Sequence, residues 1–284
     1  MKPGEPSRTA MGVALRRATH QLIDRPLVFD DPLAVTMLGE EMAQWLRADP
    51  RRGEARVAPR AMRAFLVARS RIAEDALRRA YDQGCRQYVV LGAGLDTFAY
   101  RQALADLRVF EVDQPWTQQW KRARLADVGI SEPGSLTFVP VDFETEILAT
   151  QLQRAGVDAS RPVFFSWLGV SMYLTEAVVW HTLATVAAMT RSGGGITFDY
   201  GATVTGNNIS HRLMAAALAR RVAAAGEPFR SSFAPQVIAD HLHRLGFIGI
   251  DDLDDDAMNA RYFANRDDGL AVRGSGRIVT AWAG

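Results

Sequence analysis

The chain has 284 residues, of which 48% are hydrophobic and 23% are charged. These proportions are those of a globular protein with a packed core, so they exclude a disordered or fibrous chain. Lys and Arg number 33 against 32 Asp and Glu, and the net charge of +1 excludes a protein that binds polyanions by bulk charge. Cys85, the single cysteine, can form neither an internal disulfide nor a thiolate zinc site.

Nothing in the sequence points to a membrane or to export. No stretch reaches the roughly 18 apolar residues that a membrane-spanning helix needs. Residues 1–21 carry basic groups but lack the apolar run and cleavage site of a signal peptide. Because a single cysteine also suits a reducing compartment, we expect a cytoplasmic protein with no nucleic-acid or membrane partner.

Residues 1–84 are predicted to be mostly helical and to form an N-terminal cap. Asp31 and Pro32 are typical of a helix start, and the segment DPLAVTMLGEEMAQWLR that they begin has apolar positions at helical spacing. After a charged break, residues 60–84 have the pattern of a long amphipathic helix that ends at Gly84.

From residue 85 onward, strand patterns alternate with helix patterns. Short β-rich runs are expected to be strands at residues 87–94, 107–113, 135–142, 161–167 and 193–200. Helical patterns lie between them at 115–127, 143–155 and 175–191. This alternation predicts crossover units in a mostly parallel sheet, whose ligands bind beyond the carboxyl ends of the strands.

The rest of the chain is expected to complete this sheet. Residues 234–246 have a helical pattern, and 247–253 and 276–283 have strand patterns. We therefore predict about seven strands, with the last two antiparallel at the edge. An Ala-rich helical segment within residues 201–233 is predicted to be a lid. The predicted division is a cap, 1–84, and a core, 85–284.

The clearest functional signal is VVLGAGLDTFAYR, residues 89–101. A hydrophobic strand runs directly into Gly92 and Gly94, where glycines permit a tight turn and let a ligand lie against bare backbone. Asp113 ends the next strand, where an acidic side chain can accept hydrogen bonds from a ribose diol. The alternatives are an ordinary strand-to-helix turn and a helix cap before Pro115, but the combined spacing favours a nucleotide-type ligand.

The same stretch argues against a ligand with a diphosphate. The dinucleotide fingerprint has a third glycine three residues after the second, and this chain has Thr97 there. Asp96 beside the turn would repel a phosphate, whereas a positively charged ligand with a ribose and no phosphate suits it. S-adenosylmethionine, with its sulfonium and ammonium groups, meets that description.

A second acid, Asp142, ends the third predicted strand and precedes Phe143. A carboxylate there can accept a hydrogen bond from an adenine amino group while the aromatic ring packs on the base. Asp142 is also suited to capping a helix that begins at Phe143, and the two roles are compatible.

These motifs together resemble the leucine carboxyl methyltransferase family. The resemblance is carried by LGAGLDTFAYR, FEVDQPWTQQWKRARL, VPVDF and LGVSMYLTEAVV, and the pair LGAGLDT and EVDQP is highly specific. Within the family, the chain is similar to the bacterial branch of S-adenosylmethionine-dependent O-methyltransferases from about Ser7 to Ala281. The resemblance implies an α/β, Rossmann-like class I methyltransferase fold that carries the helical cap and the lid.

The resemblance also implies roles for particular residues. Arg69, in VARSR, matches the arginine that holds the methionine carboxylate of the cofactor through a bidentate charge-assisted pair, although its helical pattern alone indicates a solvent-facing side chain. Arg17 lies near a basic position that can reach the same carboxylate. The other matching residues are Gly92 and Gly94 for the cofactor loop, Asp113 for the ribose, and Asp142 and Phe143 for the adenine.

One position departs from the family pattern. Many members have a glutamate before the Gly-Val-x-Met-Tyr-Leu run, and this chain has Leu168 there. The change removes a carboxylate from the expected methyl-donor pocket, so recognition of the ammonium group or positioning of the substrate falls to other groups, such as backbone carbonyls. Trp167 beside it either walls the pocket or packs in the core.

We therefore expect an S-adenosylmethionine-dependent O-methyltransferase that acts on a carboxyl or hydroxyl group of a small molecule, without a metal. Two alternatives stay open. A nicotinamide-dependent oxidoreductase would use the same type of sheet but is disfavoured by Thr97. A cofactor-binding subunit without catalysis is compatible with Leu168. No motif identifies a catalytic base, the acceptor or the oligomeric state.

Overall fold

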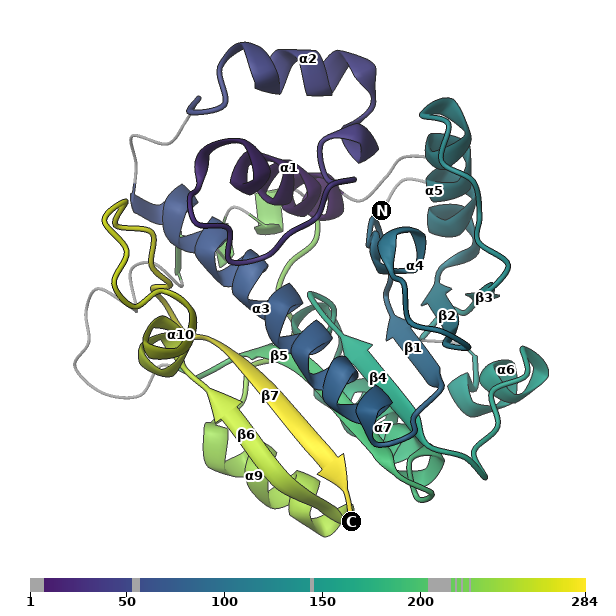
Figure 1. Cartoon of the computed structure of the whole chain (residues 1–284). Helices are drawn as coiled ribbons and strands as arrows, with labels where there is room; N and C mark the ends of the chain where they lie inside the picture. Colours follow the sequence, from purple (N-terminus) through teal and green to yellow (C-terminus); the bar gives the residue numbers. More distant parts are fainter. Residues whose placement is uncertain are drawn as a thin grey trace.

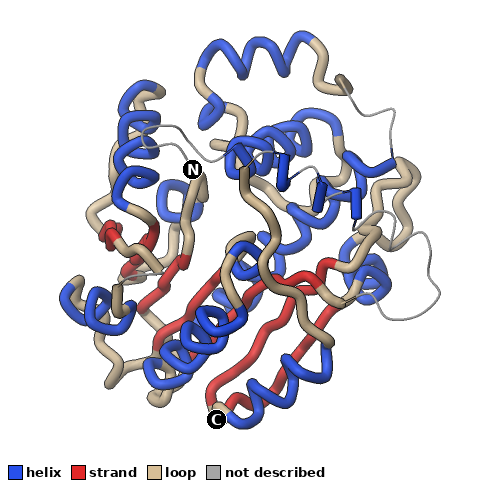
Figure 2. The backbone as a smooth tube through the Cα atoms, turned by 180° about the vertical axis from the view of Figure 1, so that it is seen from behind, coloured by secondary structure: helices blue, strands red, loops and turns tan. Residues whose placement is uncertain are grey.

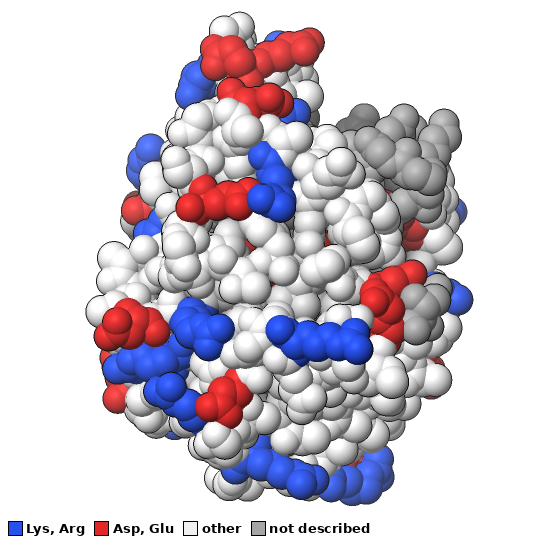
Figure 3. Space-filling model, turned by 90° about the vertical axis from the view of Figure 1, so that its right-hand side faces the viewer, with Lys and Arg blue, Asp and Glu red and all other residues white. Residues whose placement is uncertain are grey.

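The computed structural model of the chain describes residues 8–52, 57–143, 146–203, 216–217, 219–220, 222–224 and 226–284. A seven-stranded sheet crosses the molecule and carries helices on both faces (Figures 1 and 2). The strand order is β3-β2-β1-β4-β5-β7-β6. On the face drawn in Figure 3, acidic and basic side chains are interspersed, as the near-zero net charge leads one to expect.

Every predicted strand is present. The strands are β1 (Gln87–Leu91), β2 (Arg108–Asp113), β3 (Leu136–Pro140), β4 (Val163–Trp167), β5 (Gly194–Gly201), β6 (Phe247–Leu253) and β7 (Gly276–Ala283). β1 to β5 pair in parallel, whereas β7 runs antiparallel to both β5 and β6. The antiparallel pair expected at the edge is therefore β7 with β6, and β6 itself points the same way as the first five strands.

Helices lie against both faces of the sheet, and others lie beyond its strand ends (Figure 1). They are α1 (Arg8–Ile23), α2 (Glu40–Ala48), α3 (Val57–Asp82), α4 (Phe98–Arg101), α5 (Pro115–Asp127), α6 (Leu148–Arg154), α7 (Glu176–Met189), α9 (Pro235–Arg244) and α10 (Asp255–Tyr262), with short 3-10 helices η1 (Thr36–Leu38) and η2 (Ser171–Tyr173). On one face, Phe165 of β4 packs with Leu183 of α7. On the other, Phe164 packs with Leu77 of α3 and Phe98 of α4.

The long amphipathic helix that the sequence predicts is α3, which begins slightly earlier, at Val57, and ends before Gly84. It packs along β4, β5 and β7, so the middle of the helix lies beside the sheet (Figure 1). α1 and α2 lie at the end of the molecule toward which β1 and β2 run. No helix in the described ranges has the length and hydropathy needed to cross a membrane.

Three elements differ from the sequence-based expectation. The helix expected from Asp31 to Arg47 is interrupted at Gly39, whose φ of +83° separates η1 from α2. The helix expected at 143–155 begins only at Leu148. The acidic run at 251–256 has the composition that predicts a solvated loop, but it ends β6 and then starts α10, where Asp254 accepts a hydrogen bond from the Ala257 N–H at 2.9 Å.

The start of β5 gives a test of the β4–β5 packing. A Cβ added at Gly194 would overlap the backbone oxygen of Val163, and its φ is +100°. Gly193 has a similar φ of +110°, but a Cβ there would lie 3.5 Å from Pro162, at ordinary contact distance. We expect Gly194→Ala to lower the free energy of unfolding by about 1–3 kcal/mol more than the matched Gly193→Ala does. If urea denaturation gave the same loss of unfolding free energy for both variants, the close approach of Gly194 to the Val163 backbone would be contradicted.

Candidate functional site

The loop after β1 turns through two glycines with left-handed backbone. Gly92 has a φ of +68° and Gly94 a φ of +47°. A Cβ at Gly92 would overlap the Cγ2 atom of Val170, so the protein's own packing demands a glycine there. At Gly94 the nearest atom to an added Cβ would be the Cβ of Ala10, at 3.9 Å. The backbone of Gly94 is therefore the less crowded part of the loop.

Asp113, at the end of β2, is bonded to this loop. Its Oδ2 atom accepts a hydrogen bond from the Gly94 N–H at 2.6 Å, and its Oδ1 atom accepts one from the Gln114 N–H at 2.7 Å. Gln114, not Asp113, is the N-cap residue of α5. Burial raises the pKa of Asp113, while the two backbone hydrogen bonds and the charge of Lys121 oppose that rise. Each carboxylate oxygen has two lone pairs, so Asp113 can still accept from a ligand.

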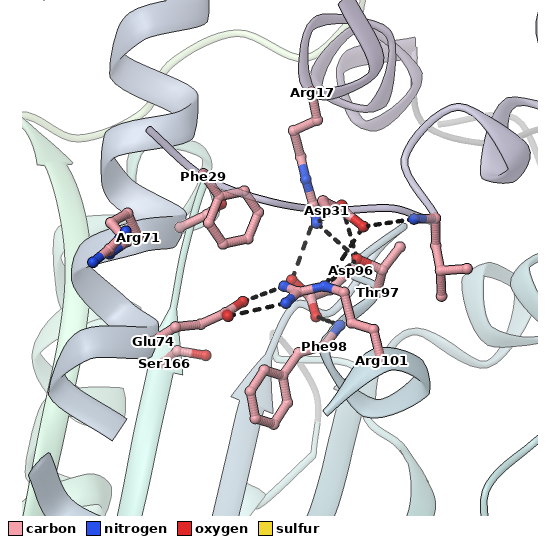
Figure 4. Close-up of polar contacts among 12 residues, drawn as sticks. Arg17, Phe29, Asp31, Arg71, Glu74, Asp96, Thr97, Phe98, Arg101 and Ser166 are labelled. Carbon is pink, nitrogen blue, oxygen red and sulfur yellow. Dashed lines mark hydrogen bonds and ion pairs between the residues drawn. The ribbon is translucent and has the colours of Figure 1, made fainter. Parts of the chain in front are cut away.

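A buried polar network joins α1 to the residues after the glycine loop (Figure 4). Arg17 donates from Nη2 to Oδ2 of Asp31 at 2.5 Å and to the Thr97 hydroxyl at 2.9 Å. The Thr97 hydroxyl donates to Asp31 at 2.9 Å and accepts from Nε of Arg101 at 3.1 Å. Arg101 also makes a two-pronged ion pair with Glu74 of α3. Thr97, where a dinucleotide fold has glycine, is thus a connector between the cap and the loop.

Asp96 places a negative charge beside this loop. Its Oδ1 atom accepts from the Phe98 N–H at 2.8 Å, and its Oδ2 atom lies 3.7 Å from Nη1 of Arg17. Burial opposes ionisation of Asp96, but the charges of Arg17, Lys121 and Arg101 outweigh it, so the pKa is lowered. A carboxylate at the start of α4 disfavours a phosphate at that position.

Arg69 lies on α3, opposite the end of β4. Its side chain retains 10% of its exposure, so the solvent-facing position that its helical pattern alone indicates is wrong. Nη1 of Arg69 donates to Oδ2 of Asp199, on β5, at 2.8 Å. Oδ1 of Asp199 accepts from the Gly169 N–H at 2.5 Å. The sequence did not single out Asp199, although an acid within the apolar run ITFDY was an available signal.

Asp142 and Phe143 lie beyond the end of β3 and are both half-buried. Phe143 packs against the core layer that contains α6 and α7. The N–H of Asp142 donates to the Glu146 carboxylate at 2.8 Å, and the Glu146 N–H donates back to the Asp142 carbonyl at 2.9 Å. Because α6 begins at Leu148, Asp142 closes a turn here and does not cap that helix.

The chain after β4 is covered by the end of the expected lid. The Arg230 N–H donates to the Met172 carbonyl at 2.7 Å, and the Thr9 hydroxyl of α1 donates to the Glu227 carboxylate. Residues 226–231 are thereby joined to both η2 and α1. Residues 204–215, 218, 221 and 225 of the predicted lid lie outside the described residues.

Trp167 and Leu168 differ in their surroundings. Trp167 is 0% exposed and packs with Phe198 at a ring-centroid distance of 6.2 Å, which confirms the core position. Leu168 is half-buried at the strand end. Among the described residues, the Asp199 carboxylate is bonded to this turn, through the N–H of the next residue, Gly169.

Glu111 and Lys121 form a buried ion pair under the same strand ends. The Lys121 Nζ atom lies 2.6 Å from Oε2 of Glu111, and both side chains are almost fully buried. Burial raises the pKa of Glu111 to about 7, against the opposing charge and hydrogen bond of Lys121. The acid within VFEVD was the available sequence signal for this pair.

Comparisons with known proteins match most of the chain. The model of the family described as "Leucine carboxyl methyltransferase" matches residues 10–187. A Bacillus subtilis protein named "Putative S-adenosyl-L-methionine-dependent methyltransferase YktD" is 34% identical over 96% of this chain and 96% of its own length. A Mycobacterium avium protein with the same description is 34% identical over 58% of this chain and 56% of its own length.

Two solved structures share the fold over nearly the whole chain. A "putative methyltransferase" from Thermobifida fusca aligns with a TM-score of 0.58 and 16% identity over 98% of this chain and 95% of its own. A "duf574 family protein" from Streptomyces avermitilis aligns with a TM-score of 0.54 and 17% identity over 99% of both chains. The seven-stranded sheet with helices on both faces is therefore a Rossmann-like methyltransferase fold.

The Glu111–Lys121 pair makes stability depend on pH. The pKa of Glu111 is about 7 in the folded chain against an ordinary value of 4.5, so its stabilising contribution is complete below 4.5 and is lost as the pH rises through 7. The glutamine side chain in Glu111→Gln has no titrating proton, so the variant does not lose this stability as the pH rises. We expect the stability of the variant, relative to the wild type, to rise between about pH 5 and about pH 8 in urea denaturation. A difference that does not change with pH would contradict the raised pKa.

The Thr97 network gives a second stability test. Thr97→Val keeps the shape of the side chain but leaves the buried groups of Asp31, Arg17 and Arg101 without their shared hydroxyl. We expect a loss of about 1–3 kcal/mol in the free energy of unfolding. Thr182 is the matched control, because its buried hydroxyl bonds only the Val178 carbonyl of its own helix among the described residues. A Thr182→Val loss as large as that of Thr97→Val would contradict the role of the network.

Proposed function

Since the chain belongs to the leucine carboxyl methyltransferase family, we propose that it methylates an oxygen atom of a small-molecule acceptor, with a carboxylate as the favoured acceptor group. The protein is an S-adenosylmethionine-dependent methyltransferase, and the alternative of a nicotinamide-dependent oxidoreductase is therefore dropped. When bound, the cofactor supplies an activated methyl group on its sulfonium sulfur. The chain's own residues then have to hold the two reactants in line and keep water out.

The residues at the strand ends fit this cofactor. Asp113 would accept hydrogen bonds from the ribose diol, beside the bare backbone of Gly92 and Gly94. Asp142 and Phe143 would hold the adenine. Arg69 would hold the methionine carboxylate, and the ionised Asp96 would disfavour a diphosphate ligand. Support comes from the Gly94–Asp113 bond at 2.6 Å and from the burial of Arg69 near the end of β4.

Tyr173 is the observation that favours a carboxylate acceptor. It follows β4 in η2, and burial raises the pKa of its hydroxyl, so it keeps its proton at neutral pH and does not act as a base. His20 is held between Asp24 and the backbone N–H groups of Val28 and Phe29. A phenol or alcohol needs a base to remove its proton, whereas a carboxylate is already ionised at pH 7.

The other described histidines lie on helices and not on the loops that follow β1 and β4. His181 is on α7, and His241 and His243 are on α9, which packs beside β6. His211 lies outside the described residues. These positions support an acceptor that needs no general base.

The cap and the lid are proposed to enclose the acceptor. Within the predicted cap, 1–84, α1 contacts the loop after β1 through Arg17, and contacts Glu227 through Thr9. Residues 201–233 would close the other side of the pocket over the predicted core, 85–284. Such closure would exclude water and fix the line of attack.

Replacing Asp113 tests the ribose contact. We expect Asp113→Ala to weaken binding of S-adenosylhomocysteine by about 1–3 kcal/mol, because a charged acceptor of hydrogen bonds is lost. Asp252→Ala is the control, since that carboxylate pairs with Tyr200 and Arg277 at the β6 edge. Isothermal titration calorimetry measures both. An unchanged affinity in Asp113→Ala would contradict the ribose contact and leave this side chain with the role of holding the glycine loop.

The acceptor itself is tested with S-adenosylmethionine that carries a deuterated methyl group. Small carboxylic acids, phenols and alcohols are incubated with the protein, and products are found by mass spectrometry. We expect the label on oxygen, and mild base should release it as methanol, since methyl esters hydrolyse and methyl ethers do not. Label on nitrogen or carbon would contradict the proposal. Cofactor binding without turnover of any acceptor would support the non-catalytic alternative.

A further inference from the structure

Arg69 is a buried arginine with most of its hydrogen-bonding capacity unused. A guanidinium has five N–H donors. Among the described residues, the single hydrogen-bond partner of Arg69 is Asp199, whose Oδ2 atom accepts from Nη1 at 2.8 Å. The Arg69 side chain is 10% exposed and that of Asp199 is 0% exposed. None of the Arg69 nitrogens is among the fully buried side-chain atoms that lack a partner, so the unused donors face accessible space, where a ligand can supply acceptors.

Asp199 fixes this guanidinium in one place. Its second oxygen accepts from the Gly169 N–H at 2.5 Å, so one carboxylate links α3 to the turn after β4. The guanidinium lies directly on that turn, because a Cβ added at Gly169 would be 2.8 Å from both Nη1 and Nη2 of Arg69. Gly169 also has a φ of +74°. The backbone turn, the arginine and the carboxylate therefore form one unit.

This unit adjoins the position where the chain departs from its family. Leu168 stands directly before Gly169, and the resemblance places a glutamate there in many members. Asp199 comes from the neighbouring strand, β5, and hydrogen-bonds the very next backbone N–H. A carboxylate is thus present at this turn although residue 168 does not provide it.

We propose that Asp199 is a positioning residue for the amino-acid end of the cofactor. Its carboxylate holds the Arg69 guanidinium on the Gly169 turn, and the remaining N–H groups of Arg69 then donate to the cofactor carboxylate. This inference rests on the proposed cofactor site. The competing explanation is a purely structural tie between α3 and β5, which would affect every ligand equally.

Two nucleosides separate these explanations. S-adenosylhomocysteine has the amino-acid end, whereas 5′-methylthioadenosine has the same adenosine and thioether without it. For the wild type we expect S-adenosylhomocysteine to bind more tightly. Asp199→Asn should raise its Kd by about tenfold or more, as for the loss of a charged partner, and leave the Kd of 5′-methylthioadenosine within about twofold.

The controls use the same helix. Asp24→Asn removes the carboxylate from another buried arginine of α3, Arg63, which Asp24 holds at 2.8 and 3.0 Å. It should leave the ratio of the two Kd values unchanged. Arg69→Met/Asp199→Asn removes both charges, so no unpaired buried charge threatens folding, and it should lose the same discrimination as Arg69→Met alone.

The outcomes are distinct. Equal weakening of both nucleosides in Asp199→Asn would overturn the positioning role and leave the cofactor site standing. Unchanged discrimination in the double variant would overturn both the positioning role and the Arg69 contact of the proposed cofactor site. Additive losses from the two substitutions would also overturn the positioning role, because a residue that acts through Arg69 has no effect once Arg69 is gone. A wild-type protein that binds neither nucleoside would overturn the proposed cofactor site together with this inference.

Discussion

The hydrogen bond from the Gly94 N–H to the Asp113 carboxylate fixes the glycine loop against the end of β2. The sheet makes this bond possible, because β1 and β2 pair in parallel with Leu91 opposite Val112, so both strands finish at the same edge. A second bond, from the Gln114 N–H, holds the other carboxylate oxygen. With both oxygens oriented by backbone, the carboxylate keeps one geometry without a ligand.

Buried pairs of charged side chains lie near the Asp113 carboxylate. Lys121 pairs with Glu111, on the same strand as Asp113, and the Arg17–Asp31–Thr97 network ties the cap to the loop. Buried pairs of this kind contribute little net stability, but loss of one partner is costly because the other charge is left alone. The main effect of these pairs is therefore to fix the relative positions of α1, the glycine loop and α5. Their net contribution to the free energy of unfolding is small. Asp199 has the same effect on Arg69 at the end of β4.

The parts of the fold that the sequence predicted are those set by local patterns. β6 and β7 begin and end where their apolar runs do, and Pro115 marks the start of α5, because proline is favoured in the first helical turn. The break at Gly39 was missed, since a single glycine within a helical pattern is often tolerated. The start of α10 was not predicted, because a run of acidic residues is typical of a solvated loop, whereas Asp254 is a helix cap here.

The contacts at the candidate site depend on residues far apart in the chain. Arg69 and Asp199 are separated by 130 positions, and Arg17 and Thr97 by 80, so no window of sequence relates them. Arg69 was selected through its family match, and its burial follows from where α3 lies on the sheet. An acid inside an apolar strand, as at Glu111 and Asp199, was the one local sign of both buried pairs.

The most direct test of the account is a crystal structure of the full chain grown with S-adenosylhomocysteine. The account places both ribose hydroxyls within hydrogen-bonding distance of the Asp113 carboxylate, and the ligand carboxylate on Arg69 while Arg69 stays paired with Asp199. A ligand bound elsewhere, or a ribose held without Asp113, would contradict it.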